Sequence, residues 1–324
     1  MADLKSSYSA ADNIPVKLIK NYELMHSMMT KRIILPIHVQ FIISNKCNLK
    51  CPFCSCSNDD RETDMSLEDA LRLIELMARL GTKSVTITGG GEPLLHPNFI
   101  EILEAFNEAN IDVGLVTHGL ELHPDLPLEN VVWCRISNAD HRKLTVNYLK
   151  NLSETVQAIP QVDWAFSHVV SSEPNFDEIQ RVIEFANLHK FTHVRLVADL
   201  LDYCNVNLNI VKKEMKDRGV DDQLVIYQGR NEPTKGGPCY ICYLKPIIGA
   251  DCKVYACCGA QYALKTPSRY MPQELCLGSA FELEEIIKNS DKPFDGSICY
   301  RCYYDNYNKI LETILAKTEH MNFV

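Results

Sequence analysis

Residues 47–54 read CNLKCPFC and directly follow the β-rich stretch HVQFIIS at residues 37–43. That stretch predicts a β-strand, so the three cysteines lie in a loop at its carboxyl end. Barrels and doubly wound sheets place their chemistry at that end. Three thiolates in one tight loop suit an iron–sulfur cluster with one open iron, whereas structural zinc normally takes four ligands. Cys56, two residues after Cys54, fits the same cluster poorly.

Short β-rich runs alternate with longer segments of helical period from residue 37 to about residue 197. Further strands are expected at 84–88, 112–117, 131–137, 163–170 and 193–198, with helices at 66–81, 98–110, 141–156 and 175–190. Strands and helices in repeated order imply right-handed parallel βαβ units. The fold class is therefore α/β, as an open doubly wound sheet or a full or partial barrel.

The helix expected at 66–81 has the clearest amphipathic pattern. Ser66 is placed to cap its start and Gly81 to end it. Its predicted apolar face is made of Leu67, Ala70, Leu71, Ile74, Met77 and Ala78.

The string CxxxCxΦC, with Phe53 in the aromatic position, resembles the signature of the radical S-adenosylmethionine (SAM) superfamily. The stretch TGGGEPLLHP at residues 88–97 closes the second expected strand as the superfamily's glycine-rich motif does. The order of strands, glycines and helices over roughly residues 35–200 is similar to the superfamily's partial (β/α)6 barrel. The resemblance thus implies a partial TIM-type barrel.

The resemblance also implies cofactors and their ligands. Cys47, Cys51 and Cys54 would hold a [4Fe-4S] cluster whose fourth iron is chelated by SAM. An external one-electron donor such as flavodoxin or ferredoxin would reduce the cluster, which then cleaves SAM to methionine and a 5′-deoxyadenosyl radical. By position, the implied cofactor-binding residues are Phe53, Gly89, Gly90, Gly91, Glu92, Ser137 and Arg195.

Several of these positions also have a purely structural explanation. Gly89–Gly91 allow a ligand to approach the backbone and allow positive φ, but a plain strand-to-helix turn uses glycines as well. Ser137 is an ordinary residue for a strand end, and Arg195 can make core contacts instead. His118 stands where many relatives carry asparagine, so its role is left open.

A second set of cysteines begins at residue 239. Fourteen cysteines without an export signal favour metal or cluster ligation over disulfides, because cytosolic thiol buffers keep them reduced. Residues 236–304 resemble the SPASM and twitch auxiliary-cluster domains, with Cys252 at the glycine position of their hairpin turn. The resemblance implies an auxiliary [4Fe-4S] cluster, for which structural zinc is the alternative. Its ligands would be Cys239 or Cys242, with Cys239 preferred, and Cys257, Cys299 and Cys302.

The 324 residues divide into four expected parts, namely an N-terminal extension at 1–35, the barrel at 36–203, a polar linker at 204–235 and the auxiliary domain at 236–324. No apolar run of about 18 residues and no signal peptide is present, so a cytoplasmic protein without membrane contact is expected. The net charge of −9 disfavours broad capture of duplex nucleic acid, although it is compatible with a local basic groove.

The predicted function is that of a radical SAM enzyme, an oxidoreductase, isomerase or cross-linking enzyme. A peptide or protein side chain is the first expected substrate, because relatives with such a C-terminal region often modify ribosomally made peptides. The alternative within enzymes is a nucleotide, modified base, sugar or amino-acid-derived metabolite. A non-catalytic iron–sulfur or zinc protein for electron transfer or scaffolding is the alternative from another class, but it needs neither the GGGEP motif nor an open-iron triad.

Overall fold

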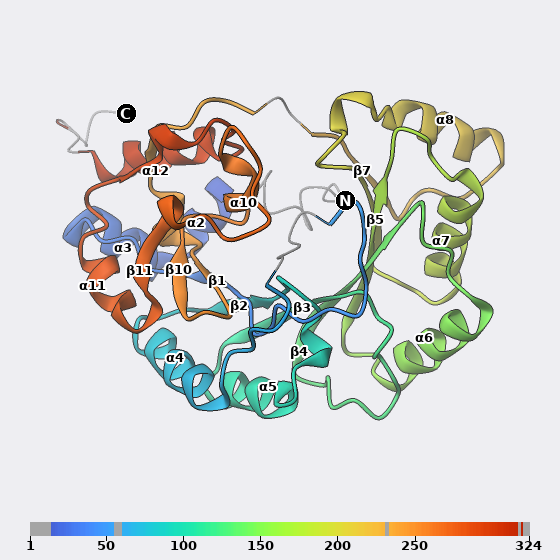
Figure 1. Ribbon diagram of the computed structural model, residues 1–324, viewed down its shortest axis with the longest axis horizontal. Coiled ribbons are helices and arrows are strands. Elements are labelled where there is room, and N and C mark those ends of the chain that lie inside the picture. Colours follow the sequence, from blue (N-terminus) through green and yellow to red (C-terminus); the bar gives the residue numbers. More distant parts are fainter. Residues whose placement is uncertain (1–13, 55–59, 231–232, 317–318, 320–324) are drawn as a thin grey trace.

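The computed structural model describes residues 14–54, 60–230, 233–316 and 319. The main sheet has ten strands in the described residues, seven of which run in parallel through the barrel part, and helices cover the outer side of that part, as Figure 1 shows. The strands of the barrel part are β1 (His38–Phe41), β2 (Ser84–Ile87), β3 (Asp112–Thr117), β4 (Val131–Ala139), β5 (Asp163–Val170), β6 (His193–Ala198) and β7 (Val225–Gln228). The helices between them are α4 (Leu67–Arg79), α5 (Phe99–Glu108), α6 (Val146–Ala158), α7 (Phe176–Leu188) and α8 (Leu208–Asp217).

The predicted α/β fold is confirmed in its partial-barrel form. Each strand from β1 to β7 pairs in parallel with the next one along the chain. The order of the whole sheet is linear, and its two end strands do not pair within the described residues. The barrel is therefore open, with helices outside and a concave inner wall (Figure 1).

Helix α4 shows how the local sequence sets the boundaries of an element. The Ser66 side chain accepts a hydrogen bond from the backbone N–H of Asp69, and Gly81 follows the helix with φ of +81°. Its buried residues are Ala70, Leu73, Ile74, Leu76 and Met77. The predicted face was wrong at Leu71, whose exposed fraction is 42%.

The segment expected as a linker, residues 204–235, differs from that prediction. It contains α8, on whose inner side Val211 and Met215 are fully buried, and it contains strand β7, which pairs with β6. The short apolar run at residues 225–228 is flanked by polar residues, which hid it. This segment continues the alternation of strand and helix, while the division into domains stays a prediction.

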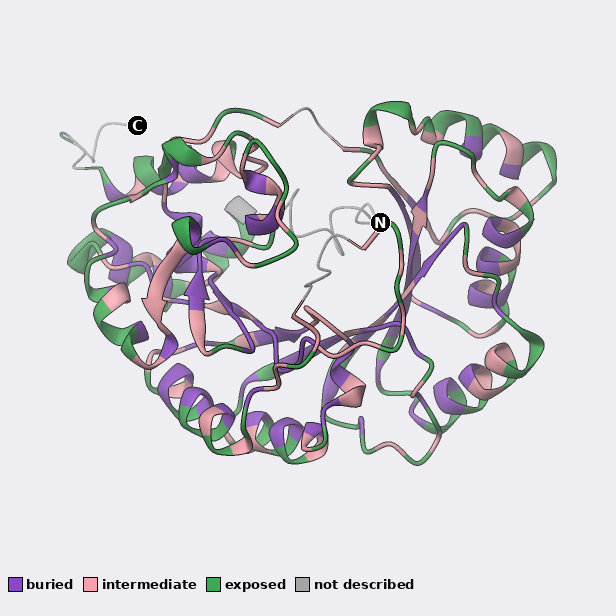
Figure 2. Ribbon diagram, viewed as in Figure 1, coloured by how far each residue is buried: buried purple, intermediate pink, exposed green. Residues whose placement is uncertain are grey.

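The C-terminal part joins the same sheet at its other end. Strand β9 (Ile247–Ile248) pairs in parallel with β1, and β10 (Lys253–Tyr255) and β11 (Cys276–Ser279) follow it antiparallel. Barrel and C-terminal side chains form one continuous hydrophobic core (Figure 2). The remaining elements are β8 (Pro238–Cys239), β12 (Phe294–Asp295), α9 (Ile241–Leu244), α10 (Ala260–Ala263), α11 (Leu283–Lys288) and α12 (Asp305–Leu315).

From residue 14 on, where the described part of the chain begins, two helices precede β1, namely α2 (Ile14–Lys20) and α3 (Tyr22–Lys31). Helix α3 packs against α12, and the backbone N–H of Ile34 donates to Ser290 Oγ over 2.8 Å. The expected N-terminal extension is thus attached to the C-terminal part. Short 3-10 turns lie at Pro93–Leu95, Tyr203–Asn205, Gln273–Leu275, Ala280–Glu282 and Gly296–Ile298. None of the helices in the described ranges combines the length and the apolar character that crossing a membrane requires.

Candidate active site

The three predicted cluster ligands lie in the loop that follows β1. Cys47, Cys51 and Cys54 are all partly exposed and unbonded to one another. Arg61 fixes the loop from outside, because its Nη1 donates to the carbonyl oxygens of Cys47 and Leu49 over 3.3 and 2.9 Å. Cys56 lies outside the described residues.

The entry to this loop is held by one carboxylate. Asp64 accepts from Ser44 Oγ over 2.6 Å and from Lys46 Nζ over 2.7 Å. Both donors belong to the chain between β1 and Cys47, so the first ligand starts from a fixed backbone.

The donor set fits an iron–sulfur cluster. Burial raises the pKa of the Cys51 thiol, and the neighbouring Cys54 and Cys47 raise it further, so the three sulfur atoms lie near one another. Three soft thiolates on one partly exposed loop are what a cluster with one open iron requires.

The glycine motif packs directly on this loop. The N–H of Gly91 donates to Ser44 O over 2.9 Å, and that of Glu92 to Lys46 O over 2.7 Å. A Cβ at Gly90 would lie 2.1 Å from Asn45 Oδ1, and one at Gly91 would lie 2.0 Å from Lys46 O. Among described glycines, positive φ occurs at Gly81, Gly119, Gly219 and Gly278. Close backbone packing, rather than the expected positive φ, thus explains the glycines of the motif.

Replacing Gly91 by alanine is expected to destabilise the protein by about 3 kcal/mol or more, because its Cβ would overlap backbone that cannot move without shifting the cysteine loop. Urea unfolding would measure the loss, and iron content after reconstitution would measure the effect on the loop. Gly229 is a matched control, since a Cβ there meets nothing within 4 Å. Equal stability of the two variants would contradict this account.

The carboxylate of Glu92 is hydrogen-bonded to groups of the protein itself. Its Oε1 accepts from Thr117 Oγ1 over 2.6 Å and its Oε2 from the N–H of His118 over 2.8 Å. The side chain has an exposed fraction of only 2%, so the carboxyl group joins the glycine motif to the end of β3. This geometry favours a positioning role over a direct cofactor contact.

Burial raises the pKa of Glu92 to about 7 from 4.5. Between these two values the folded protein keeps a proton that the unfolded chain has released, so the free energy of unfolding should fall as the pH rises from about 4.5 to about 7. The difference corresponds to about 3 kcal/mol. Glu92→Gln should flatten this part of the pH profile of urea unfolding, and exposed Glu129→Gln should not. An unchanged profile in the first variant would contradict the assignment.

His118 connects β3 to the cysteine loop, a role that the sequence did not reveal. Its Nε2 lies 2.8 Å from Asn48 Oδ1, and its Nδ1 accepts from the N–H of Leu120. Burial lowers the pKa of His118 to about 4, so the ring is neutral and donates from Nε2. Its 3.4 Å approach to Glu92 is therefore not an ion pair at neutral pH.

The other predicted cofactor residues lie on β4, on β6 and in the cysteine loop itself. Phe53 packs against His141, with ring centroids 4.8 Å apart. Ser137 O accepts from Arg142 Nη1, and Arg195 donates from Nη2 to Ser167 Oγ over 2.8 Å. Phe53 and Ser137 thus frame the loop, while Arg195 lies on the inner wall.

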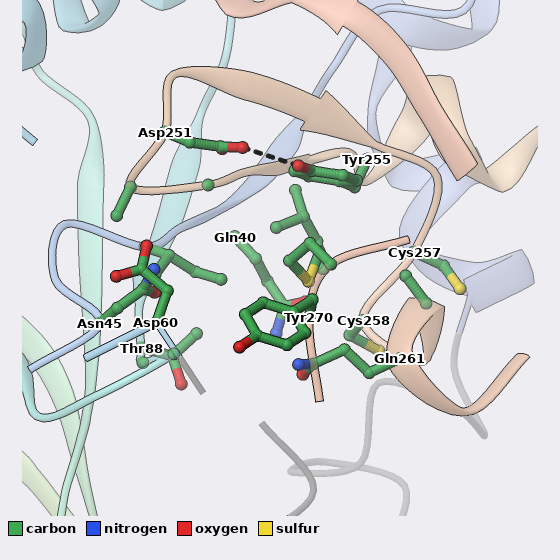
Figure 3. A pocket seen from close by; sticks show the side chains of 18 of the residues that line it. Gln40, Asn45, Asp60, Thr88, Asp251, Tyr255, Cys257, Cys258, Gln261 and Tyr270 are labelled. Atoms are coloured by element: carbon green, nitrogen blue, oxygen red, sulfur yellow. Dashed lines mark hydrogen bonds between the residues drawn. The ribbon is translucent and has the colours of Figure 1, made fainter. Parts of the chain in front are cut away.

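A cavity opens between the glycine motif and the C-terminal part, with an empty volume of about 830 Å³ including the part open to solvent. Figure 3 shows Asn45 and Thr88 on one side and Cys258 and Gln261 on the other. The sulfur atom of Cys257 points away from the cavity in this view.

The second cysteine set gathers around Cys239. Burial raises the pKa values of Cys257, Cys299 and Cys302, and the charge of Cys239 adds to each shift, so its sulfur lies near all three. Cys242 is fully buried and its thiol donates to Cys239 O. Within the described residues no three His, Cys, Asp or Glu side chains converge on one point as a single metal ion would need. A four-iron cluster binds its thiolates at separate irons, so it does not require such convergence.

Cys252 occupies the turn between β9 and β10 with φ of 56°, so it adopts the backbone conformation that favours the glycine it replaces.

One contact places the second cysteine set relative to the first. Tyr262, in the helix that follows Cys257, donates from its hydroxyl to Cys54 O over 3.3 Å. The C-terminal part therefore touches the first cysteine loop directly.

Comparisons with known proteins point to the same site. A family model described as "Radical SAM superfamily" matches residues 41–130. GTP 3',8-cyclase of Parasynechococcus marenigrum (strain WH8102) is 39% identical over 79 residues, which are 24% of this chain and 22% of that relative. Probable GTP 3',8-cyclase of Pyrococcus horikoshii is 26% identical over 162 residues, 46% of this chain and 52% of that relative. The chain thus spans from under a quarter to about half of the length of these two relatives.

Solved structures show the same fold. Streptococcus suis SuiB bound to precursor peptide SuiA has a TM-score of 0.59 at 15% identity, covering 85% of this chain and 70% of that one. Native anSMEcpe with bound AdoMet and Kp18Cys peptide has a TM-score of 0.52 at 18% identity, covering 79% and 83%. The match of residues 41–130 to the radical SAM superfamily model agrees with the open parallel barrel and with the CxxxCxxC loop at the end of its first strand.

Proposed function

We propose that this protein is an enzyme that cleaves SAM reductively in order to abstract a hydrogen atom from a small molecule of nucleotide type. The observation that carries the proposal is the packing of the glycine motif on Ser44 and Lys46, which lead directly into the CNLKCPFC loop, beside a cavity. When bound, the cluster and SAM supply the one-electron chemistry. A flavodoxin or ferredoxin is the proposed electron donor.

In this proposal Cys47, Cys51 and Cys54 hold the first cluster. Backbone at Gly89–Gly91 and the residues Phe53 and Ser137 contact SAM, as the superfamily resemblance implies, whereas Arg195, which the same resemblance also implies for SAM, is assigned to the substrate below. Glu92 and His118 keep the glycine motif and the cysteine loop in register through their hydrogen bonds. These groups orient the cofactor and do not transfer protons.

An auxiliary [4Fe-4S] cluster is proposed in a SPASM- or twitch-like C-terminal part. Its ligands would be Cys257, Cys299 and Cys302 together with Cys239, whose sulfur is near the other three. Cys242 is the poorer fourth ligand, because it is fully buried. Zinc on the same thiolates remains the alternative.

The relatives favour a nucleotide over the peptide that the sequence placed first. Both curated relatives above are GTP 3',8-cyclases, and the likeness to peptide-bound SuiB concerns only the fold. A non-catalytic carrier would have no use for the close contact between GGGEP and an open-iron triad, which supports an enzyme.

Anaerobic reconstitution followed by reduction tests the proposal. The protein should bind about eight irons per chain, as expected for two cubes, and should convert SAM to 5′-deoxyadenosine, measured by chromatography. Iron binding without 5′-deoxyadenosine would favour the carrier. About four irons with one zinc would favour the structural zinc site.

A further inference from the structure

Two arginines lie on the inner wall of the barrel, away from the helices. Arg135 on β4 and Arg195 on β6 flank β5, whose inward residues between them are the small Ala165 and Ser167. The opposite faces of these strands carry residues such as Ile136 and Phe166, which are fully buried in the core. The wall between the arginines is therefore lined by small side chains.

Neither arginine has a carboxylate partner within the described residues. Arg195 donates from Nε and Nη2 to Ser167 Oγ, and Arg135 stacks over the Trp133 ring at 4.9 Å. The Nε of Arg135 is buried and has no hydrogen-bond partner. Asp163, which precedes Ala165 on the same face of β5, is exposed to solvent.

The two guanidinium groups lie close enough to repel one another. Burial lowers the pKa of Arg195 well below its usual range, and the charges of Arg135 and then Arg230 lower it further. Burial also lowers the pKa of Arg135 to about 10. His193 beside them is neutral, since burial and the same two arginines lower its pKa to about 4. Both arginines are half-buried on this wall, and like charges held close together without a counter-charge destabilise a free protein.

Other polar groups around the same wall also lack partners. The Oε1 atoms of Gln40 on β1 and of Gln228 on β7 are buried without a hydrogen bond. Gln40 also lines the cavity beside the glycine motif, so the wall and the cavity are continuous there. Buried polar groups without partners in a folded protein call for a bound group that satisfies them.

We propose that Arg135 and Arg195 bind an anionic group of the substrate, a phosphate or a carboxylate, on the inner wall of the barrel. The inference rests on the proposed function and narrows its substrate class to anionic small molecules. Guanidinium groups bind both anions in bidentate fashion, and an anion between them removes their mutual repulsion. Gln40 and Gln228 accept hydrogen bonds from the remainder of the same molecule.

Calorimetric titration of the anaerobically reconstituted protein tests this proposal, with SAM at saturation. Pyrophosphate serves as the phosphate probe and succinate as the carboxylate probe, and an uncharged nucleoside is the control ligand. One anion should bind, and Arg135→Gln and Arg195→Gln should each weaken it about tenfold to hundredfold. Arg79→Gln, at an exposed position on α4, is the matched control.

A stability measurement separates binding from a structural role. Removing one of two repelling half-buried charges should raise the Tm of the anion-free protein, by roughly 2 °C or more, whereas a structural arginine would lower it. Affinity unchanged in both variants, no binding of either anion, or a lowered Tm would overturn the proposal. Displacement of the anion by SAM would also overturn it, because the arginines would then bind the SAM carboxylate. SAM cleavage by the unaltered protein is measured separately. A failure of the proposed function can therefore be told apart from a failure of the anion-binding proposal.

Discussion

Replacing Cys47, Cys51 and Cys54 together by alanine is expected to reduce 5′-deoxyadenosine formation to background. Cys47, Cys51 and Cys54 are the cysteines that the loop offers within the described residues, and each would hold one iron of the cube and leave the fourth for SAM. Iron should fall from about eight to about four per chain, because the second set of thiolates is untouched. Iron analysis and chromatography of the reduced protein with SAM would measure both changes.

The matched control is Cys204→Ala. Cys204 is an exposed free cysteine outside both sets, so its loss should change neither iron content nor SAM cleavage. If the triple variant still produced 5′-deoxyadenosine, the assignment of the loop would be wrong. If it lost all iron, the two sites would not assemble independently.

Replacing Cys299 and Cys302 by alanine is expected to remove the second cluster and to abolish substrate conversion. Folding of a region organised around metal depends on its ligands, so residues 236–304 should lose order. Because Tyr262 of this region donates to Cys54 O and both parts share one core, SAM cleavage should fall as well, by about fivefold for the loss of one hydrogen bond. Iron content, limited proteolysis and 5′-deoxyadenosine yield would measure these effects.

Tyr262→Phe separates the two effects, since it removes the hydroxyl and keeps all thiolates. It should reproduce the fivefold loss of SAM cleavage while about eight irons remain bound. Full SAM cleavage in the double cysteine variant would show that the hydrogen bond from Tyr262 to Cys54 O does not affect activity. Full substrate conversion in that variant would show that the enzyme does not need a second cluster.

The parts of the fold that the sequence predicted well are those with local patterns. Strands 112–117, 163–170 and 193–198 were expected at their observed bounds, because continuous β-rich runs ended at turn residues. Strand β7 has four residues and β9 two, and each owes its existence to a neighbouring strand rather than to its own pattern. Such short strands form because they pair with neighbouring strands in the folded protein, and the hydrophobic periodicity of the sequence does not predict that pairing.

The candidate site divides in a similar way. The cysteine loop follows from spacing, whereas the contact of His118 with Asn48 joins residues from two strand ends and has no local signal. Arg135 stands in the stretch VVWCRIS, where only the register of three strands reveals that it shares a wall with Arg195. Contacts between residues so far apart in the sequence can be identified only once the fold is known.

The pairing of β1 with β9 has a consequence for how the chain is made. Strand β1 ends at Phe41 and its partner begins at Ile247, so roughly two hundred residues are synthesised before that edge of β1 is covered. At about 5–20 residues per second, the nascent chain exposes an open strand edge for roughly 10–40 seconds. An exposed edge recruits other strands, so a ribosome-bound or truncated chain that stops before β9 is prone to aggregate. The cysteine loop, which directly follows β1, therefore acquires its final support only after roughly two hundred further residues have been made, and stable cluster insertion has to wait until then.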